Sequence, residues 1–232
     1  MRELVLDTET TGFEPAEGHR IVEIGAVELV NLMPTGRTYH QYINPERDMP
    51  QGAFEVHGLS EDFLRDKPVF TEIVDSFLAF VGDARLVIHN AAFDMKFLNA
   101  ELEWATRPLL PPEQAFDTLA FARQKFPGSP ASLDALCRRF GIDNSARTKH
   151  GALLDSEILA EVYLELLGGQ QPDLVLSSEP ARDANGAVAP RAPLPKRPAP
   201  LPPRLTEAER KAHQGLVAAL GEDAIWRRYA QT

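Results

Sequence analysis

The sequence predicts an α/β domain with a mixed sheet, followed by a flexible linker and a short helical tail. Strand-like and helix-like patterns alternate over residues 1–170, and three strand patterns come before the first long helix pattern. The composition then changes near residue 177, where prolines become frequent. A chain of 232 residues with 44% hydrophobic content can bury one sizeable core and a small appendage.

The strand patterns are short apolar or alternating segments bounded by turn residues. They cover residues 3–7, 21–30, 38–43, 86–89 and 115–117. The helix patterns place apolar residues three or four positions apart. They cover residues 71–81, 92–103, 118–125, 132–140 and 152–167. Gly168 and Gly169 are expected to end the last helix, because glycine commonly follows a helix C-terminus.

Beyond residue 170 the sequence predicts a linker and a tail. Prolines crowd residues 177–203, a composition that favours an extended chain without a core. Thr206 is suited to cap a helix with an acidic first turn, which we expect to reach Leu220. The tail has too few apolar residues to fold alone, so we expect it to dock on another surface. The predicted organisation is a domain over 1–170, a linker over 171–203 and a docking tail over 204–232.

Composition limits the function classes. The net charge is -10, and the acidic excess lies in residues 1–170. Such a body does not fit a protein that grips long nucleic acid unaided, whereas a metal-dependent enzyme that touches few phosphates is compatible with it. The single cysteine, Cys137, excludes an internal disulfide and a cysteine-rich zinc site. With no signal-peptide pattern and no long apolar run, we expect a soluble cytoplasmic protein.

Asp7 and Glu9 stand at positions i and i+2 at the end of the first apolar strand. Their side chains therefore point to the same face of the sheet. Two like charges in a dry environment are unfavourable unless a cation compensates them. From this stretch alone, two interpretations stay open: a divalent-metal site, or a strand end that enters an acidic loop.

Three further residues carry possible chemistry. Asp94 begins the helix after strand 86–89, where it is either catalytic or a helix-start acid that interacts with the helix dipole. Asp155 lies on the apolar stripe of helix 152–167, so metal ligation or a buried ion pair is expected, and Asp7 and Glu9 favour the metal. His150, on the loop before Asp155, is suited to act as a general base for water; the alternative is an ordinary surface histidine.

Taken together, Asp7-x-Glu9, Asp94 and the pair His150 and Asp155 resemble the DEDDh exonuclease family. The resemblance is closest to the family members that proofread as subunits of bacterial replicative polymerases. It is carried by residues 6–12, 24–28, 56–58, 87–94, 132–137 and 150–155, and it is weak over the linker and tail. The resemblance implies a ribonuclease H-like fold, a mixed five-stranded sheet flanked by helices.

The resemblance also implies a reaction, namely 3′→5′ removal of nucleotides from a DNA end with two Mg²⁺ or Mn²⁺ ions. It implies that the metal ligands are Asp7, Glu9, Asp94 and Asp155. It implies that His150 deprotonates the attacking water. The residues implied to hold the terminal nucleotide are Thr8, Thr10, Thr11, His57 and Phe93. His57 would reach the 3′ end, whereas packing beneath the site is the alternative for Phe93.

Two positions need separate interpretation. The family members compared carry an acidic residue five positions before the histidine that matches His57, and this chain has Gly52 there. A contact to the terminal sugar is therefore missing or supplied otherwise, which we expect to tune end binding. Asp117 matches a family position too, but a strand-end carboxylate that accepts backbone hydrogen bonds is the favoured interpretation.

Several partners are implied beyond the DNA end. Gln171, Leu174 and Leu176 resemble the short peptide that binds the bacterial sliding clamp. By position, the tail resembles the segment that tethers the exonuclease to the polymerase subunit, which would raise its concentration near the primer end. A small third subunit of the polymerase core is a further candidate.

Two other functions are alternatives to proofreading. A free-standing DEDDh nuclease acting on RNA 3′ ends would have no need of the linker and tail. A non-catalytic bridging subunit would gain nothing from a cluster of uncompensated acids.

Overall fold

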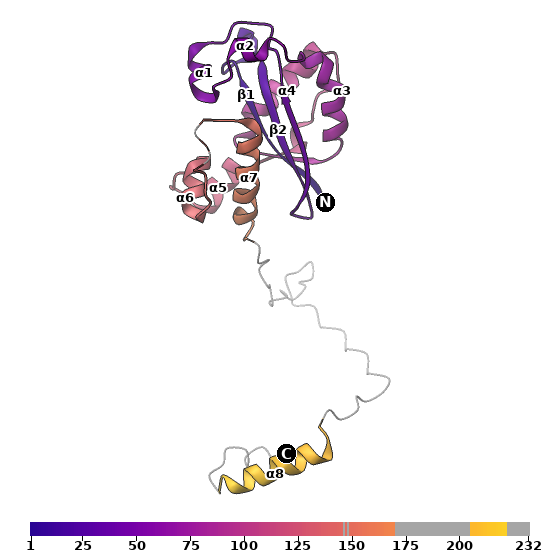
Figure 1. Cartoon of the computed structure of the whole chain (residues 1–232), viewed down its shortest axis with the longest axis vertical. Coiled ribbons are helices and arrows are strands. Elements are labelled where there is room, and N and C mark those ends of the chain that lie inside the picture. The colour runs from indigo at the N-terminus through magenta and orange to yellow at the C-terminus, as the bar shows by residue number, and fades with distance from the viewer. Residues whose placement is uncertain (146, 148, 170–204, 222–232) are drawn as a thin grey trace, which may run out of the picture. The chain divides into compact units, whose positions relative to one another are not determined.

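The structure is a computed structural model that describes residues 1–145, 147, 149–169 and 205–221 (Figure 1). The chain divides into two units, residues 1–175 and 176–232. The segment 171–176 predicted to bind the clamp, the rest of the linker and residues 222–232 lie outside the described residues. None of the described helices is both long and apolar enough to cross a membrane.

The first unit is built on a mixed sheet with the strand order β3-β2-β1-β4-β5. β1 pairs antiparallel with β2 and parallel with β4, so the antiparallel and parallel halves of the sheet meet at β1. β3 adds antiparallel to β2, and β5 adds parallel to β4. The five strands are β1 (Arg2–Thr10), β2 (Ile21–Val30), β3 (Met33–Tyr42), β4 (Arg85–Ile88) and β5 (Ala115–Asp117).

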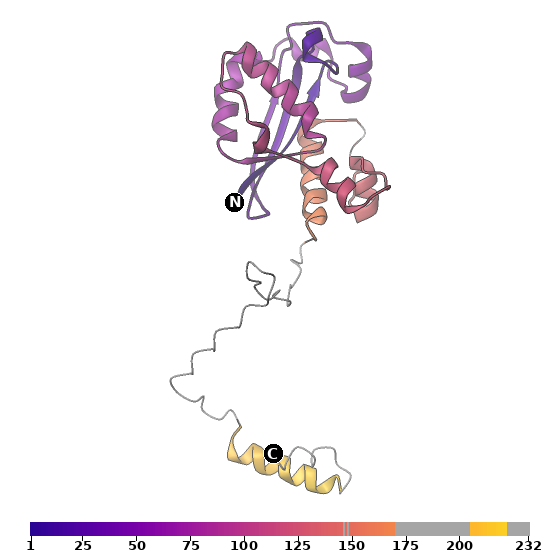
Figure 2. The same ribbon diagram turned by 180° about the vertical axis from the view of Figure 1, so that it is seen from behind.

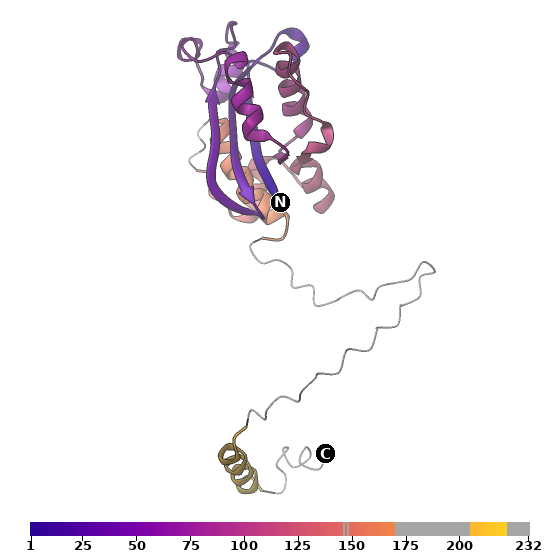
Figure 3. The ribbon, with the colours of Figure 1, turned by 90° about the vertical axis from the view of Figure 1, so that its right-hand side faces the viewer.

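Helices cover both faces of this sheet, with α3 and α4 on one face and α7 on the other (Figures 1 and 2). The helices of the first unit are α1 (Gln51–His57), α2 (Glu61–Leu64), α3 (Phe70–Val81), α4 (Ala91–Trp104), α5 (Thr118–Lys125), α6 (Leu133–Phe140) and α7 (Ala152–Leu166). Two 3₁₀ turns, η1 (Pro15–Glu17) and η2 (Pro112–Gln114), lie in the connections. After a quarter turn, the long strands β2 and β3 are seen side by side next to the helices (Figure 3).

The alternation of side chains along β1 divides the core into two layers. Leu4 and Leu6 pack into the large cluster that includes Phe77 of α3 and Phe97 of α4. Val5 packs on the other face, in a cluster with Tyr163 of α7. Burial of each such side chain contributes about 2 kcal/mol of transfer free energy. Because the alternation continues along β1, the acidic residues two and four positions after Val5 face α7.

α7 docks closely on β2 at Gly25. A side chain at Gly25 would overlap the backbone of Ala152 and Leu153, so this contact requires glycine. The Ser156 hydroxyl donates a hydrogen bond to the Gly25 carbonyl oxygen at 2.9 Å. The Ala152 N–H donates to the Glu23 carboxylate at 3.1 Å, which satisfies one free donor of the first turn. These contacts fix the turn of α7 that carries Asp155.

The element boundaries agree closely with the sequence patterns except at a few places. The patterns at 21–30, 115–117 and 118–125 match β2, β5 and α5. β1 runs to Thr10 instead of residue 7, because Asp7, Thr8 and Glu9 pair with β2 across the ladder. β3 begins at Met33 instead of residue 38, since it pairs with β2 directly after the turn. The first part of β3 is exposed, so it lacks the apolar alternation that marks a strand.

Two short helices, α1 and α2, were not predicted. α1 begins after Pro50 and contains Gly52, a residue with weak helix propensity. α2 has only four residues, too few for an apolar period. In the second unit, α8 (Glu207–Ala219) lies within the range predicted for a tail helix, and the Thr206 side chain accepts a hydrogen bond from the Glu209 N–H as its cap.

Candidate active site

Four acidic residues approach one another where β1, α4 and α7 meet. Asp7 and Glu9 come from β1, Asp94 from the first turn of α4 and Asp155 from the first turn of α7. Glu9, Asp94 and Asp155 are all buried, and Asp7 is partly buried. The pKa of Asp7 is raised well above its ordinary value, first by burial and then by the negative charges of Asp94, Glu9 and Asp155. The fold therefore brings together the four acids that the sequence pattern singled out.

Burial also raises the pKa values of Glu9 and Asp94. The pKa of Glu9 rises to about 8, through burial and then the charges of Asp155 and Glu23. The pKa of Asp94 rises to about 7, with burial as the main cause. No hydrogen bond or ion pair reaches the carboxylates of Asp7 or Glu9 from the described part of the chain. Such groups carry a strong electrostatic preference for an added cation.

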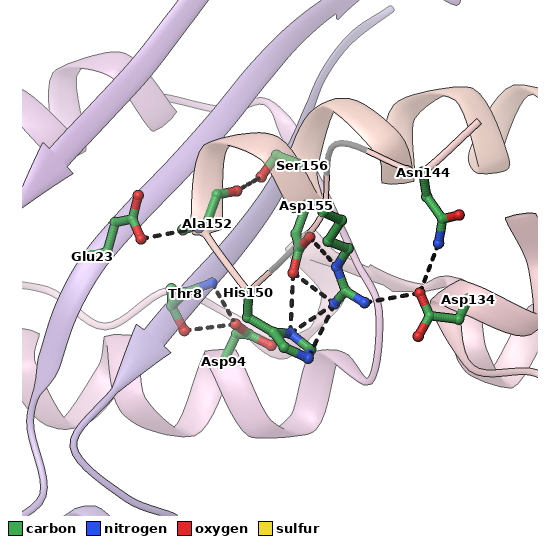
Figure 4. A network of polar contacts seen from close by, with 10 residues as sticks. Thr8, Glu23, Asp94, Asp134, Asn144, His150, Ala152, Asp155 and Ser156 are labelled. Atoms are coloured by element: carbon green, nitrogen blue, oxygen red, sulfur yellow. Dashed lines mark hydrogen bonds and ion pairs between the residues drawn. The ribbon is translucent and has the colours of Figure 1, made fainter. Parts of the chain in front are cut away.

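Asp94 is positioned by the strand beside it. Its Oδ1 accepts hydrogen bonds from the Thr8 N–H at 3.1 Å and from the Thr8 hydroxyl at 2.7 Å (Figure 4). Both bonds lower the pKa of Asp94, although burial outweighs them. The Thr8 side chain thus orients a carboxylate of the cluster, a role that the sequence did not suggest.

Asp155 differs from the other acids because basic groups surround it. His150 Nδ1 lies 3.2 Å from Asp155 Oδ2 (Figure 4). Arg147 Nε and Nη2 donate to the two carboxylate oxygens at 2.5 Å and 2.8 Å. Burial alone would raise the pKa of Asp155, but the hydrogen bonds from His150 and Arg147 hold it below its ordinary value. Sequence reasoning missed Arg147, and the only signal for it was a basic residue on the loop before His150.

The donor set suits a hard divalent cation. Glu9, His150 and Asp155 each offer a ligand atom, and these atoms all lie within 4.8 Å of one another. Carboxylate oxygens are the preferred ligands of Mg²⁺ and Mn²⁺, and an imidazole nitrogen suits the latter as well. Asp7 and Asp94 contribute further negative charge to the same place. The residues present therefore fit the metal that the family resemblance implies.

Thr10 and Thr11 lie at the end of β1, where their hydroxyls bind the following loop. The Thr10 hydroxyl donates to the Gly12 carbonyl oxygen at 2.6 Å. The buried Thr11 hydroxyl accepts from the Arg20 N–H at 3.0 Å and contacts His19 Nδ1 at 3.1 Å. These contacts hold the loop from Gly12 to Arg20 against the strand end.

His57 ends α1 close to the loop that carries His150. Its Nδ1 accepts a hydrogen bond from the Leu59 N–H at 3.0 Å, so the neutral ring carries its proton on Nε2. Nε2 is the one buried side-chain polar atom without a partner among the residues the structure describes. Burial and then the charge of Lys149 lower the pKa of His57 to about 4. The His150 N–H donates to the Val56 carbonyl oxygen at 3.2 Å, which ties α1 to the site.

The remaining residues singled out from the sequence lie nearby or have structural roles. Phe93 is half-buried against the large core cluster, with its ring centroid 5.0 Å from that of Phe97. Asp117 accepts hydrogen bonds from the N–H groups of Leu119, Ala120 and Asn90, which confirms its predicted structural role. Gly52 is exposed, and a β-carbon there would meet no atom within 4 Å.

Comparisons with known proteins agree with this architecture. The family model described as Exonuclease matches residues 4–163. The chain is 24% identical to Exonuclease X, solved in complex with 5′ overhanging duplex DNA, with a TM-score of 0.53 over 72% of this chain and 90% of that chain. It is 21% identical to the nuclease domain of 3′hExo, a DEDDh family member bound to rAMP, with a TM-score of 0.60 over 72% of this chain and 91% of that chain. At these identities the likeness shows the fold alone.

The curated relatives are closer in sequence. The DNA polymerase III subunit epsilon of Rickettsia felis is 59% identical over 174 residues, which cover 74% of this chain and 76% of the relative. The subunit of the same name in Escherichia coli is 52% identical over 177 residues, covering 73% of this chain and 72% of the relative.

The fold and the site therefore define a nuclease of the exonuclease family with a ribonuclease H-like fold. At this level of identity the chain belongs, within that family, to the epsilon subunits of bacterial DNA polymerase III. Its activity is 3′→5′ proofreading exonucleolysis in the replicative polymerase.

Proposed function

We propose that the acidic cluster binds two divalent cations, Mg²⁺ or Mn²⁺, through Asp7, Glu9, Asp94 and Asp155. The observation that carries this proposal is the raised pKa of Asp7, Glu9 and Asp94. Burial and mutual repulsion disfavour their charged forms unless positive charge is added. The bound cations would supply the electrostatic stabilisation of the attacking and leaving oxygens during hydrolysis.

His150 is the proposed general base. Its side chain is 48% exposed, so water reaches the ring, and its Nδ1 lies beside Asp155. A histidine can accept the proton of an attacking water near neutral pH, and the Asp155 carboxylate stabilises the resulting positive ring. The hydrogen bond from the His150 N–H to the Val56 carbonyl oxygen positions the backbone of this base.

We propose that the strand end and α1 hold the terminal nucleotide. His57 offers a buried Nε2–H without a partner in the described chain, which is suited to donate to the 3′ hydroxyl. Because its pKa of about 4 keeps the ring neutral at pH 7, His57 adds no charge beside the cations. The end of β1, with Thr8, Thr10 and Thr11, supplies backbone groups, and Phe93 supplies an apolar surface.

The proposed substrate is a single-stranded or frayed 3′ end of DNA. The names of the curated relatives support DNA, since each is a subunit of a DNA polymerase. The net charge of -10 is compatible with contact to only a few phosphates. Such an enzyme relies on its assembly to bring the primer end to the site.

The proposed partners follow from the tail and linker. Leu216 of α8 and Leu220, the C-cap residue that follows the helix, are 61% and 55% exposed and form an apolar strip on one side of the helix end. We propose that this strip docks on the alpha subunit of DNA polymerase III. Gln171, Leu174 and Leu176 are the proposed contacts to the sliding clamp, and a small third core subunit is a further proposed partner. The proposed location is the replisome in the bacterial cytoplasm.

One experiment tests the activity and its residues together. A DNA primer with a 3′ mismatch and an RNA oligomer are offered with Mg²⁺ to the wild type, Asp7→Ala and His150→Ala. The wild type should degrade DNA faster than RNA. Asp7→Ala should be inactive, and His150→Ala should lose about a hundredfold in rate, the usual contribution of a general base. Equal or faster cleavage of RNA would refute DNA proofreading, and activity in Asp7→Ala would refute the metal ligands.

A truncation tests the assignment of the linker and tail. Deletion of residues 171–232 should leave hydrolysis of a short single strand unchanged, because the proposed catalytic residues all lie in the first unit. The same deletion should abolish co-purification with the alpha subunit. Loss of intrinsic hydrolysis would show that the boundary is wrong.

A further inference from the structure

Arg147 is the basic side chain at the centre of the site, and the proposed mechanism does not use it. Its side chain is 9% exposed and contacts two carboxylates and a histidine. Its Nε and Nη2 donate to Asp155 at 2.5 Å and 2.8 Å, and Nη1 donates to Asp134 Oδ1 at 2.9 Å. Nη2 also lies 2.7 Å from His150 Nδ1. The guanidinium thus joins α6, α7 and the loop between them.

These contacts compete with the binding of a metal. Arg147 donates to both carboxylate oxygens of Asp155. This bidentate geometry is the one in which a guanidinium binds a carboxylate most strongly. A divalent cation needs direct contact with one of those oxygens. The guanidinium and a divalent cation would also repel each other, because both would contact the same buried carboxylate. A guanidinium that remained on Asp155 would therefore oppose metal binding.

Arg147 also forms an ion pair with a second carboxylate, that of Asp134. Asp134 is half-exposed and belongs to α6, outside the acidic cluster. Its Oδ1 also accepts from the Asn144 side-chain amide at 2.9 Å, and the Arg147 N–H donates to the Asn144 carbonyl oxygen at 3.0 Å. These bonds connect Arg147 to Asp134 without using Asp155. The guanidinium can leave Asp155 and keep one ion pair.

We propose that Arg147 is an internal counter-cation that holds Asp155 in the metal-free protein and moves onto Asp134 when a divalent cation binds. The inference rests on the proposed metal site, of which Asp155 is a ligand. Arg147 lowers the apparent metal affinity, because only the conformation with Asp155 released is competent to bind. In return, it keeps one of the four clustered acids neutralised while the site holds no metal.

The same movement reaches His150, which lies three residues after Arg147. A neutral imidazole has one N–H and one lone pair, so Nδ1 either accepts from Arg147 or donates to Asp155. When Arg147 moves away, Asp155 is the one of these two neighbours that His150 Nδ1 still contacts. Arg147 is thus a positioning residue, which links metal binding to the arrangement of the base.

The test is a direct measurement of Mn²⁺ binding by electron paramagnetic resonance, which counts free Mn²⁺ and needs no turnover. The full chain is compared with Arg147→Met, Arg147→Lys and Arg138→Met. Arg138 lies exposed on α6, so its variant makes the same charge change away from the cluster. Arg147→Met should bind Mn²⁺ about tenfold more tightly, as expected if about one tenth of the wild type has Asp155 released. Arg147→Lys should lie between, because lysine keeps the charge but cannot bind both oxygens.

Thermal unfolding supplies a second measurement. In EDTA, Arg147→Met should unfold at a lower temperature than the wild type, and Mn²⁺ should raise its midpoint more than it raises that of the wild type. If Arg147→Met does not fold, Arg147→Lys must still bind Mn²⁺ severalfold more tightly. Wild-type affinity in both variants, or an equal gain in Arg138→Met, would overturn the role of Arg147 alone. Absence of Mn²⁺ binding by the wild type would overturn the proposed metal site and this inference together.

Discussion

The first unit buries two sets of acidic side chains that differ in whether a basic side chain lies beside them. In the structural set, Arg20 holds Glu101 through two hydrogen bonds at 2.7 Å and 2.8 Å. Glu28 is held by Arg2 and by Arg37, at 2.7 Å and 3.0 Å. Glu3 accepts from the Tyr163 hydroxyl at 2.8 Å, and its Oε1 lies 3.9 Å from Arg85 Nη1. These acids join elements of the fold, and the Arg2 hydrogen bond lowers the pKa of Glu28.

The second set is the acidic cluster, in which Glu9, Asp94 and Asp155 are buried and Asp7 is partly buried, and these acids have fewer partners. Asp7 and Glu9 have no partner among the described residues, and Asp94 has only the neutral donors of Thr8. Asp155 stands between the two sets, because Arg147 partners it as an arginine partners a structural acid. The comparison shows that burial alone does not indicate function. Burial of an acid without a neighbouring positive charge does indicate function, because the compensating charge must then come from a bound cation.

Asp7→Asn gives the largest expected effect. The substitution removes a negative charge from the acidic cluster while keeping the shape of the side chain. Exonuclease activity should fall about a thousandfold, since metal ions contribute several kcal/mol of transition-state stabilisation. In EDTA, however, the free energy of unfolding should rise by about 1 kcal/mol, because like-charge repulsion is relieved. The measurements are initial rates on a single-stranded DNA and urea unfolding; a less stable metal-free variant would contradict the comparison.

Glu101→Gln makes the corresponding change in the structural set and should have the opposite effect on stability. Loss of the charge leaves Arg20 without its ion pair, so the free energy of unfolding should fall by about 3 kcal/mol. The matched control is Glu103→Gln on the exposed face of the same helix, which should change stability by less than about 0.5 kcal/mol. Urea unfolding measures both variants. Equal effects of the two substitutions would mean that the pair with Arg20 contributes little.

The pH dependence of stability should separate the metal-free from the metal-bound protein. The pKa values of Glu9, about 8, and Asp94, about 7, lie above those of the unfolded chain. The folded state therefore binds these protons more tightly, and its stability falls as the pH rises toward 8. In EDTA, the urea midpoint should decrease from pH 6 to pH 8.5, whereas saturating Mg²⁺ should remove most of the decrease. A midpoint in EDTA that rises over this range would contradict the raised pKa values.

Gly52→Glu gives the smallest expected effect, because it adds an acid on the exposed surface of α1 instead of changing one inside the acidic cluster. The position is exposed and has room for a side chain. A contact to the terminal sugar should lower KM by about threefold, the effect of one modest hydrogen bond. Gly52→Ala is the control: it should stabilise α1 by about 0.5–1 kcal/mol without changing KM. An equal change of KM in both variants would assign the effect to the helix alone.

Much of the fold could be predicted because local patterns and tertiary packing agree. β2 and α5 were correctly bounded since their residues are suited to those elements without help from distant segments. The start of β3 and the helix α1 could not be predicted locally. β3 owes its first residues to pairing with β2, and α1 depends on contacts with the loop before α7. Pairing and docking of this kind leave no period in the sequence.

Local sequence patterns and the family resemblance singled out the acids that the fold brings together. The spacing of Asp7 and Glu9 and the place of Asp155 on an apolar helix stripe are local properties, since strand and helix geometry set the direction of each side chain. Which acids have partners depends instead on tertiary packing. Arg147, Asp134 and Asp155 are distant enough in sequence that their meeting depends on how α6 packs against α7. The charge state of the site is thus a property of packing, because burial and neighbouring charges exist only in the folded chain.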